Sequence, residues 1–188
     1  CSVWCVYSWL AAPAATALLD CDYIVLAADT ATARNLVNVI AHQYLIPVVQ
    51  LGAKVQTTGT GAIERVFSVS RPITPDSGCL ACAGLIDYTR LALETLPHRQ
   101  RQQADYGSGE PAPSVITLNG IAVSHALTHL VFALTGLRLA EHDDFMRYDA
   151  RTSIVRPTEP YRSADCLVSG SSGLVGLGDL RPLPLPRS

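Results

Sequence analysis

Charged residues are scarce in this sequence of 188 residues. They make up 16% of the chain, Lys54 is the only lysine, and the formal net charge is −2. No segment gathers basic residues into a stripe, so nucleic acid is not an expected partner. Apolar residues make up 48% of the chain, which excludes a disordered protein and indicates a buried core. The length is that of a single domain.

Signals for export and for the membrane are also missing. Residues 1–19 have no positively charged opening segment, so we expect no secretory signal peptide there and treat them as a leader of uncertain role. The longest uncharged run, residues 111–137, contains Asn119, His125 and His129 and is too polar for a lipid-facing span. We interpret it as a buried core helix, and we predict a cytoplasmic protein without membrane contact.

Cysteine is too sparse for a disulfide scaffold. The chain has six, and two of them, Cys79 and Cys82, form a C-x-x-C pair. Such a pair in a loop can direct two thiolates onto one tetrahedral metal ion. The alternative is two reduced, partly buried thiols without a metal. His125 and His129 also have a spacing that metal sites use, but we interpret them as polar groups of a packed helix.

One stretch, residues 18–49, has the pattern of a strand, a helix and a second strand. Tyr23–Ala28 is an apolar run typical of a strand buried on both faces. Thr30 or Thr32 can cap a helix that runs to about Tyr44. Ile46–Val49 is the second apolar run. These features predict a βαβ unit and therefore an α/β fold.

The rest of the chain predicts a hairpin, two helices and two late strands. The predicted hairpin has strands at 53–56 and 63–69, and residues 71–78 form a loop after it. The predicted helices are 87–94 and 114–134, and the second is capped by Ser114 and ended by Gly136. The last two predicted strands are 145–148 and 152–155. Residues 157–188 are rich in Pro, Gly and Ser and predict an irregular tail.

Asp29 is the first candidate site residue. It follows the first predicted strand at its carboxyl end, where open parallel sheets bind their ligands. A carboxylate there can hold Mg²⁺ beside the phosphates of a nucleotide. The alternative is structural: Asp29 caps the following helix and pairs with Arg34.

The order and spacing of several motifs resemble the E1-like activating enzymes, a superfamily that includes the ThiF, MoeB and HesA adenylyltransferases. Asp29, Arg34 and Asn38 form D-x-x-x-x-R-x-x-x-N before I-P-V-V, and the segments 78–86 and 113–123 continue the likeness. The resemblance implies a partial Rossmann-like E1/ThiF fold, a mixed sheet with flanking helices. It covers the carboxyl-side half of that fold, and the glycine-rich nucleotide-binding half is absent.

The resemblance also implies a function. It is the ATP-dependent adenylylation of the C-terminal carboxylate of a small ubiquitin-like or sulfur-carrier protein, or of a peptide. Asp29 would hold Mg²⁺, Arg34 would steady the phosphates of ATP, and Asn38 would orient the loop. Without a glycine-rich turn, we expect this chain alone to bind ATP weakly. Two alternatives stay open: a truncated, non-catalytic E1-like module that binds a partner, and an unrelated zinc-stabilised interaction module.

A structural zinc is a further implication of the resemblance. Its ligands here would be Cys79, Cys82 and Cys166, with Ser169 in the place of a fourth cysteine. Serine is a poor zinc ligand, so either water or another side chain completes a three-cysteine site, or the site has lost its metal. The resemblance also implies a homodimer. The crossover 101–113 contains no cysteine, so we expect no thioester there.

Overall fold

The computed structural model describes residues 12–96, 115–138 and 145–185. Its elements, in chain order, are α1 (Ala12–Ala17), the 3₁₀ turn η1 (Leu18–Asp20), β1 (Ile24–Leu26), α2 (Ala31–Gln43), β2 (Val48–Thr57), β3 (Ile63–Ile73), α3 (Tyr88–Glu94), α5 (Ile116–Thr135), β4 (Phe145–Asp149), β5 (Ile154–Thr158) and the 3₁₀ turn η2 (Gly178–Leu180). The predicted Ser114 cap, residues 1–11 and the crossover 101–113 lie outside the described residues.

The strands form one mixed sheet in the order β1-β2-β3-β4-β5. β1 pairs with β2 in parallel, with Ile24 opposite Val48 and Leu26 opposite Gln50. The other three pairs are antiparallel. Because α2 connects the only parallel pair among the described strands, the predicted βαβ unit is confirmed, and the mixed sheet with flanking helices is that of a partial Rossmann-like ThiF fold.

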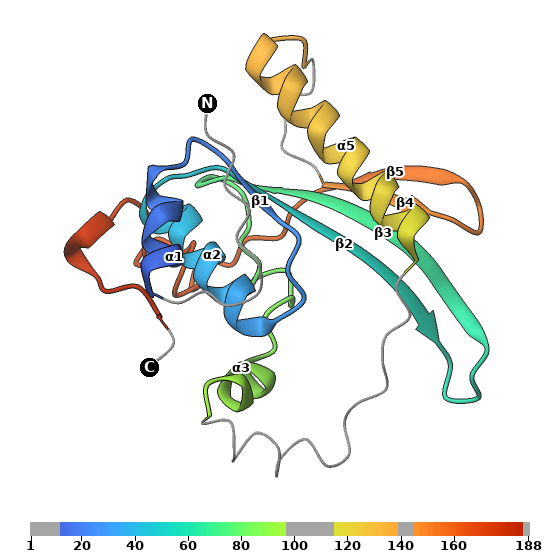
Figure 1. Cartoon of the computed structure of the whole chain (residues 1–188), viewed down its shortest axis with the longest axis horizontal. Coiled ribbons are helices and arrows are strands. Elements are labelled where there is room, and N and C mark those ends of the chain that lie inside the picture. The colour runs from blue at the N-terminus through green and yellow to red at the C-terminus, as the bar shows by residue number, and fades with distance from the viewer. Residues whose placement is uncertain (1–11, 97–114, 139–144, 186–188) are drawn as a thin grey trace.

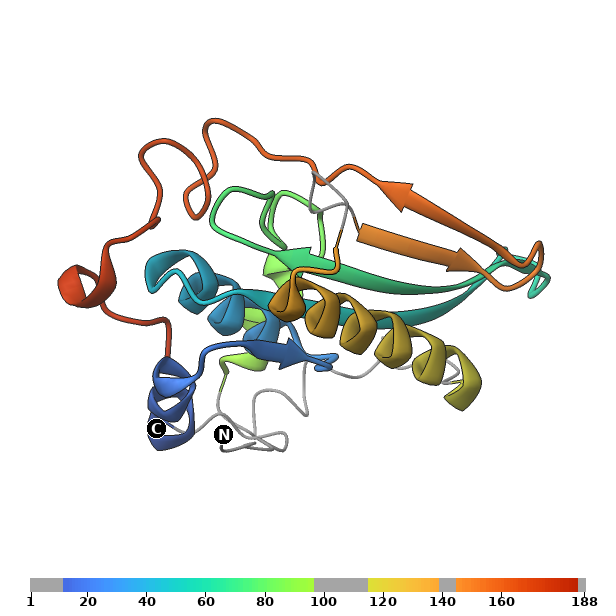
Figure 2. The same ribbon diagram turned by 90° about the horizontal axis from the view of Figure 1, so that it is seen from above.

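Helices cover both faces of the sheet (Figures 1 and 2). Neighbouring residues of a strand point to opposite faces. Val48 accordingly packs with Leu36 and Ile40 of α2 in the larger core cluster. Val49 instead packs with Ala122 and Ala126 of α5 in a second cluster. The α2 side of the sheet therefore carries most of the buried apolar surface.

The prediction that β1 is buried on both faces is wrong. Ile24 and Leu26 are buried, but Val25 between them is 45% exposed. Val25 lies opposite Val49, on the face that α5 covers. Because α5 packs on β2 and β3, the described helices leave one face of the edge strand β1 uncovered at Val25.

The hairpin strands are longer than their patterns predicted. β2 runs without a break from Val48 to Thr57, so the two predicted segments at 46–49 and 53–56 belong to one strand. β3 extends to Ile73, so Arg71 lies in a strand and not in the predicted loop. The reason is pairing: Gln50 of β2 lies opposite Arg71 of β3, and the same register continues to Val48 opposite Ile73.

The prediction of a fully buried core helix at 114–134 is wrong. α5 buries one face through Leu118, Ala122 and Ala126, while Leu127 is 47% and Val131 is 52% exposed. Gly136 ends the helix in the left-handed region at φ 69°, as predicted. Val115, without a side-chain hydrogen bond, precedes its first turn.

Length and composition alone would let α5 cross a membrane, contrary to our expectation from its polar residues. It is the one such helix in the described ranges. A single helix of this kind is weak evidence, because core helices of soluble proteins have the same length and composition. The absence of membrane contact stays a prediction.

The tail after β5 is irregular except for η2, as expected, and it is anchored to the end of α2. The buried side chain of Gln43 donates from Nε2 to the carbonyls of Gly178 and Arg181, both at 2.6 Å. Gly176 donates to the carbonyl of His42 at 3.0 Å. These bonds place the tail beside α2 and bring Cys166 near the loop that follows β3 (Figure 1).

Candidate active site and metal centre

Asp29 lies three residues beyond the end of β1, and its side chain is exposed. Thr30, not Asp29, caps α2: its backbone is extended and its Oγ1 accepts a hydrogen bond from the amide of Ala33 at 3.3 Å. No hydrogen bond or ion pair engages the Asp29 carboxylate within the described ranges. Among the described residues, nothing occupies this carboxylate at the carboxyl end of the parallel pair, where open sheets bind their ligands.

Arg34 does not form the ion pair with Asp29 that the structural alternative required. Its Nε donates to the carbonyl of Ala28 at 3.2 Å, and its Nη1 donates to the carbonyl of Leu85 at 3.5 Å. Burial, and then the positive charge of Arg90, lower the pKa of the Arg34 guanidinium, while Asp29 acts in the opposite sense. These bonds hold the guanidinium against the backbone on either side of the first turn of α2.

Glu94, at the end of α3, occupies the first turn of α2. Its Oε1 accepts from the amide of Ala31 at 3.1 Å, and its Oε2 accepts from the amide and the hydroxyl of Thr32, both at 2.8 Å. Arg90 Nε donates to the same carboxylate at 2.9 Å. The positive end of the helix dipole is thus matched by a carboxylate from 62 residues along the chain. The sequence carries no local signal for this contact.

The capping role of Glu94 leads to a stability prediction. Burial opposes ionisation, but hydrogen bonds from Thr32, Ala31 and Arg90 outweigh it and hold the pKa of Glu94 below its ordinary value of 4.5. Glu94→Gln is expected to lower the free energy of unfolding by about 1–2 kcal/mol at neutral pH. Because the folded-state pKa is depressed, this contribution is present above pH 4.5 and is lost as the pH falls through the folded-state pKa.

Urea unfolding of the two proteins across pH 3–7 measures that difference. Glu64→Gln is the matched control, because Glu64 has an exposed side chain and its contact with Arg65 is a distant 4.0 Å. An equal loss of stability in both variants, or a difference that grows as the pH falls, would contradict the cap.

Asn38 is completely buried and connects α2 to the loop that carries Cys79 and Cys82. Its Oδ1 accepts a hydrogen bond from the amide of Leu80 at 2.7 Å. Its carbonyl accepts from His42 Nδ1 at 2.8 Å, which fixes that ring nitrogen as a donor. In this arrangement Asn38 contacts the cysteine loop and faces no open surface. Its place in the nucleotide site stays a prediction.

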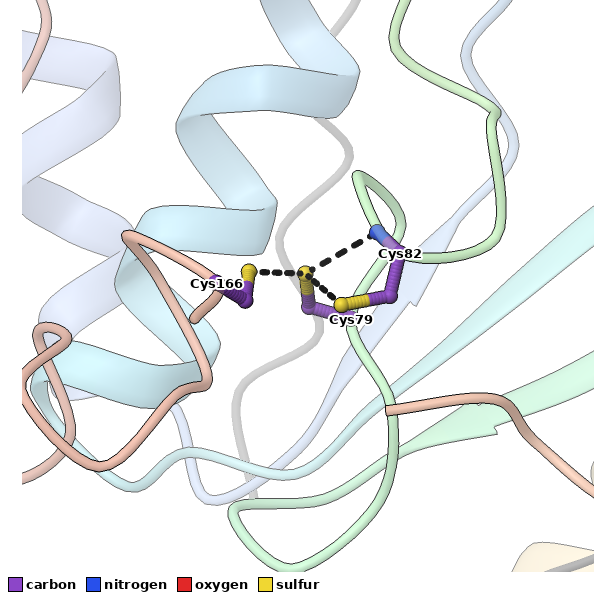
Figure 3. Close-up of side chains that lie close together, drawn as sticks. All are labelled: Cys79, Cys82 and Cys166. Atoms are coloured by element: carbon purple, nitrogen blue, oxygen red, sulfur yellow. Dashed lines mark hydrogen bonds between the residues drawn. The ribbon is translucent and has the colours of Figure 1, made fainter. Parts of the chain in front are cut away.

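Three cysteine sulfurs converge between this loop and the tail (Figure 3). Cys79 Sγ lies 3.6 Å from Cys82 Sγ and 3.5 Å from Cys166 Sγ. All three sulfurs lie within 4.8 Å of one another. The structure thus brings Cys166 to the C-x-x-C pair, as the predicted ligand set requires.

The geometry and hydrogen bonding of the three sulfurs fit a tetrahedral metal ion. With Zn–S bonds of about 2.3 Å, tetrahedral thiolates lie about 3.8 Å apart. Each sulfur also accepts a backbone N–H: Cys79 from Cys82 at 3.4 Å, Cys82 from Ser163 at 3.5 Å, and Cys166 from Val168 at 3.4 Å. Such bonds stabilise thiolates, which are the form that binds metal.

Ser169 lies beside the cluster, where the sequence placed the fourth ligand. It is completely buried, and its Oγ lies 3.6 Å from Cys82 Sγ. Its carbonyl accepts from Arg162 Nε at 2.8 Å. The next residue must be Gly170, because a Cβ there would lie 2.4 Å from the carbonyl oxygen of Cys166. The tight turn 166–170 therefore fixes the hydroxyl at the fourth side of the three thiols.

Cys79 and Cys166 differ in acidity. Burial raises the pKa of Cys79. Burial also opposes ionisation of Cys166, but hydrogen bonds from the hydroxyl and amide of Ser169 and from the amide of Val168 outweigh it and lower the pKa to about 6. Cys166 therefore loses its proton more readily than Cys79, which favours the thiolate form that binds a metal.

A comparison with models of protein families tests the resemblance to the E1-like activating enzymes that the motifs indicated. The model of the ThiF family matches residues 4–168. This chain belongs to the ThiF family. The match contains all six predicted site residues: Asp29, Arg34, Asn38, Cys79, Cys82 and Cys166. None of the curated proteins compared with the chain is similar enough to match it.

Within this ThiF chain the predicted residues form two groups joined by α2. Asp29 and Arg34 lie at the amino end of the helix, and Asn38 links its middle to the cysteine cluster. His125 and His129, on α5, belong to neither group, and His129 Nε2 lies 2.6 Å from Arg138 Nη1. The cysteine trio is the one cluster of three or more metal-binding side chains in the described ranges.

Proposed function

We propose that this ThiF-family chain takes part in the ATP-dependent adenylylation of the C-terminal carboxylate of a small ubiquitin-like or sulfur-carrier protein, or of a peptide. The observation that supports it is Asp29: an exposed carboxylate three residues beyond a parallel strand, with no hydrogen bond or ion pair to any residue that the structure describes. A group with a purely structural role at this position would cap α2 or pair with Arg34, and Asp29 does neither.

In this proposal the chain contributes binding and charge. Asp29 would hold Mg²⁺, which neutralises phosphate charge when it is bound. Arg34, fixed by the carbonyls of Ala28 and Leu85, would face the phosphates of ATP. An oxygen of the carrier carboxylate attacks the α-phosphorus, and pyrophosphate leaves with its bonding electron pair. Positioning and charge neutralisation are what such a reaction needs from a protein.

The cysteine cluster would hold a structural zinc. Cys79, Cys82 and Cys166 supply three thiolates, and the Ser169 hydroxyl or a water molecule completes the tetrahedron. The ion would link the tail to the loop that carries Cys79 and Cys82, which is hydrogen-bonded to Asn38 of α2. It would thereby stabilise the contact between this loop and α2. Reduced thiols of this kind suit a cytoplasmic location. The homodimer that the resemblance implies stays a prediction.

One observation favours the second candidate function, a non-catalytic partner-binding module. The amides of Ala31 and Thr32, at the amino end of α2, already bind the Glu94 carboxylate. They are therefore not available to a phosphate group in this arrangement. A chain that has lost nucleotide chemistry could keep such an internal cap without cost.

Carrier-dependent exchange of labelled pyrophosphate into ATP separates the two functions. The full chain would be incubated with Mg²⁺, ATP and each member of a panel of small β-grasp proteins with free C-termini. Exchange that needs one carrier, and that stops when its C-terminus is amidated, supports adenylylation. A carrier that binds by calorimetry without any exchange supports the partner-binding module and excludes the enzyme.

A further inference from the structure

A cavity of about 280 Å³ lies between the cysteine loop, β3 and the segment that follows β5. Asp29, Arg34 and Asn38 do not line it, so it is separate from the proposed nucleotide site. Of the described residues that do line it, Arg71 is the only cation and Glu159 the only carboxylate. The remaining wall is largely apolar and includes Phe145, Pro160 and Tyr161.

Arg71 is an unusual residue to find in such a wall. It lies on β3 opposite Gln50, and its Nη1 donates to Gln50 Oε1 at 2.8 Å. Its guanidinium carbon lies 4.3 Å from the centre of the Phe145 ring. Its Nε is buried without a hydrogen-bond partner. The ion pairs in the described ranges are Arg65–Glu64 and Arg90–Glu94, so Arg71 forms no ion pair with a described residue, Glu159 of the same cavity included.

Burial of the Arg71 guanidinium costs free energy that no ion pair among the described residues offsets. Burial, with a smaller effect of Arg34, lowers its pKa to about 10, so it keeps its charge at neutral pH. A buried charge without a counter-ion is expensive, and a buried N–H without an acceptor adds to the expense. An anion in the cavity that Arg71 lines would supply the missing negative charge beside the guanidinium.

The lining also selects among anions. A phosphate dianion calls for more than one positive group, and here a single guanidinium is opposed by Glu159 at the exposed edge. The planar fork of a guanidinium matches carboxylate and phosphate alike, but a carboxylate carries the single charge that one guanidinium balances. The aromatic and proline surfaces can accommodate a small apolar or peptide body behind it. We propose that this cavity binds a monocarboxylate through Arg71, either a small organic acid or the free C-terminus of a peptide.

Close backbone packing holds two walls of the cavity together. Gly78 packs so closely that a Cβ there would lie 1.9 Å from the carbonyl oxygen of Tyr161, which holds the cysteine loop against the segment after β5. Cys79 and Cys82 line the same wall. A ligand bound in the cavity would therefore contact the loop that carries two of the three thiols. The proposal does not rest on adenylylation.

The test is a titration of the full chain followed by ¹H–¹⁵N spectroscopy of the arginine Nε–H groups, without ATP or Mg²⁺. The ligands are acetate and benzoate as small acids, N-acetylglycylglycine as a peptide C-terminus, its amide as the neutral control, and inorganic phosphate as the dianion. We expect the acids to shift the Arg71 Nε–H signal, the amide to leave it unchanged, and phosphate to bind more weakly. The tighter of the two acid classes identifies the source of the carboxylate.

Variants separate the site from general anion binding. Arg71→Met is expected to weaken carboxylate binding about tenfold or more, and Arg71→Lys by less, because lysine keeps the charge but not the fork. Arg147→Met is the matched control: Arg147 lies over the ring of Phe67 at 4.2 Å but does not line the cavity. Carboxylate binding by Arg71→Met as tight as that by the wild-type and Arg147→Met proteins, an Arg71 Nε–H signal that does not shift, or phosphate binding tighter than carboxylate would overturn the proposal.

Discussion

Asp29→Asn is expected to reduce carrier-dependent pyrophosphate exchange by about 10²-fold or more. The amide keeps the size of the side chain but removes the negative charge that would hold Mg²⁺. Asp29 is exposed and makes no hydrogen bond or ion pair within the described ranges, so its replacement removes no internal contact. The loss should therefore come without a change in the melting temperature.

Asp22→Asn is the matched control for this experiment. Asp22 is also exposed, and it lies before β1, at the end of the strand opposite to Asp29. The two variants remove the same charge from the two ends of one strand, so a general effect of net charge would appear in both. Unchanged exchange in Asp29→Asn, at saturating and at limiting Mg²⁺, would show that this carboxylate has no part in the reaction.

The βαβ unit could be predicted because its signals are local. The apolar runs and the Thr30 cap act within a few residues of the elements that they define, and the Gly136 stop does the same for α5. The exposure of Val25 could not be predicted, because it depends on where α5 packs on the sheet. Arg71 was assigned to a loop because prolines follow it, but pairing with β2 extends the strand.

The candidate sites divide in the same way. The positions of Cys166 and Ser169 beside Cys79 and Cys82 were predicted through the resemblance to the E1-like enzymes, which implies a second pair of ligands there. Glu94 could not, because its contacts with the first turn of α2 join residues more than 60 positions apart. The sequence contains no periodicity or motif for such a pair. The cavity at Arg71 likewise exists only once three distant segments have packed together.

Cys79→Ser is expected to abolish zinc binding by the chain as purified from zinc-supplemented cells, whereas the wild type retains about one equivalent. Cys79 is completely buried and its sulfur lies within 3.6 Å of both other sulfurs, so it is the central ligand of the three. Because binding of a structural zinc contributes about 10–16 kcal/mol in small zinc-binding peptides, its loss should also lower the melting temperature.

Cys21→Ser is the control for that measurement. Cys21 is a free, partly buried thiol whose Sγ donates to the carbonyl of Ala17 at 3.7 Å, and it lies outside the cluster. The same thiol-to-hydroxyl change there should leave the zinc content unchanged. If the wild type and both variants contain no zinc, and a chelator does not lower the melting temperature of the wild type, the cluster is three reduced thiols.

Ser169→Cys then shows what the natural serine does at the site. The buried Ser169 Oγ already lies 3.6 Å from Cys82 Sγ, so a sulfur at this position would complete a four-thiolate tetrahedron with little rearrangement. We expect the variant to release zinc more slowly to a competing chelator than the wild type does. A faster release would mean that the larger sulfur does not fit the tight turn before Gly170, and that the hydroxyl is the group the fold accommodates.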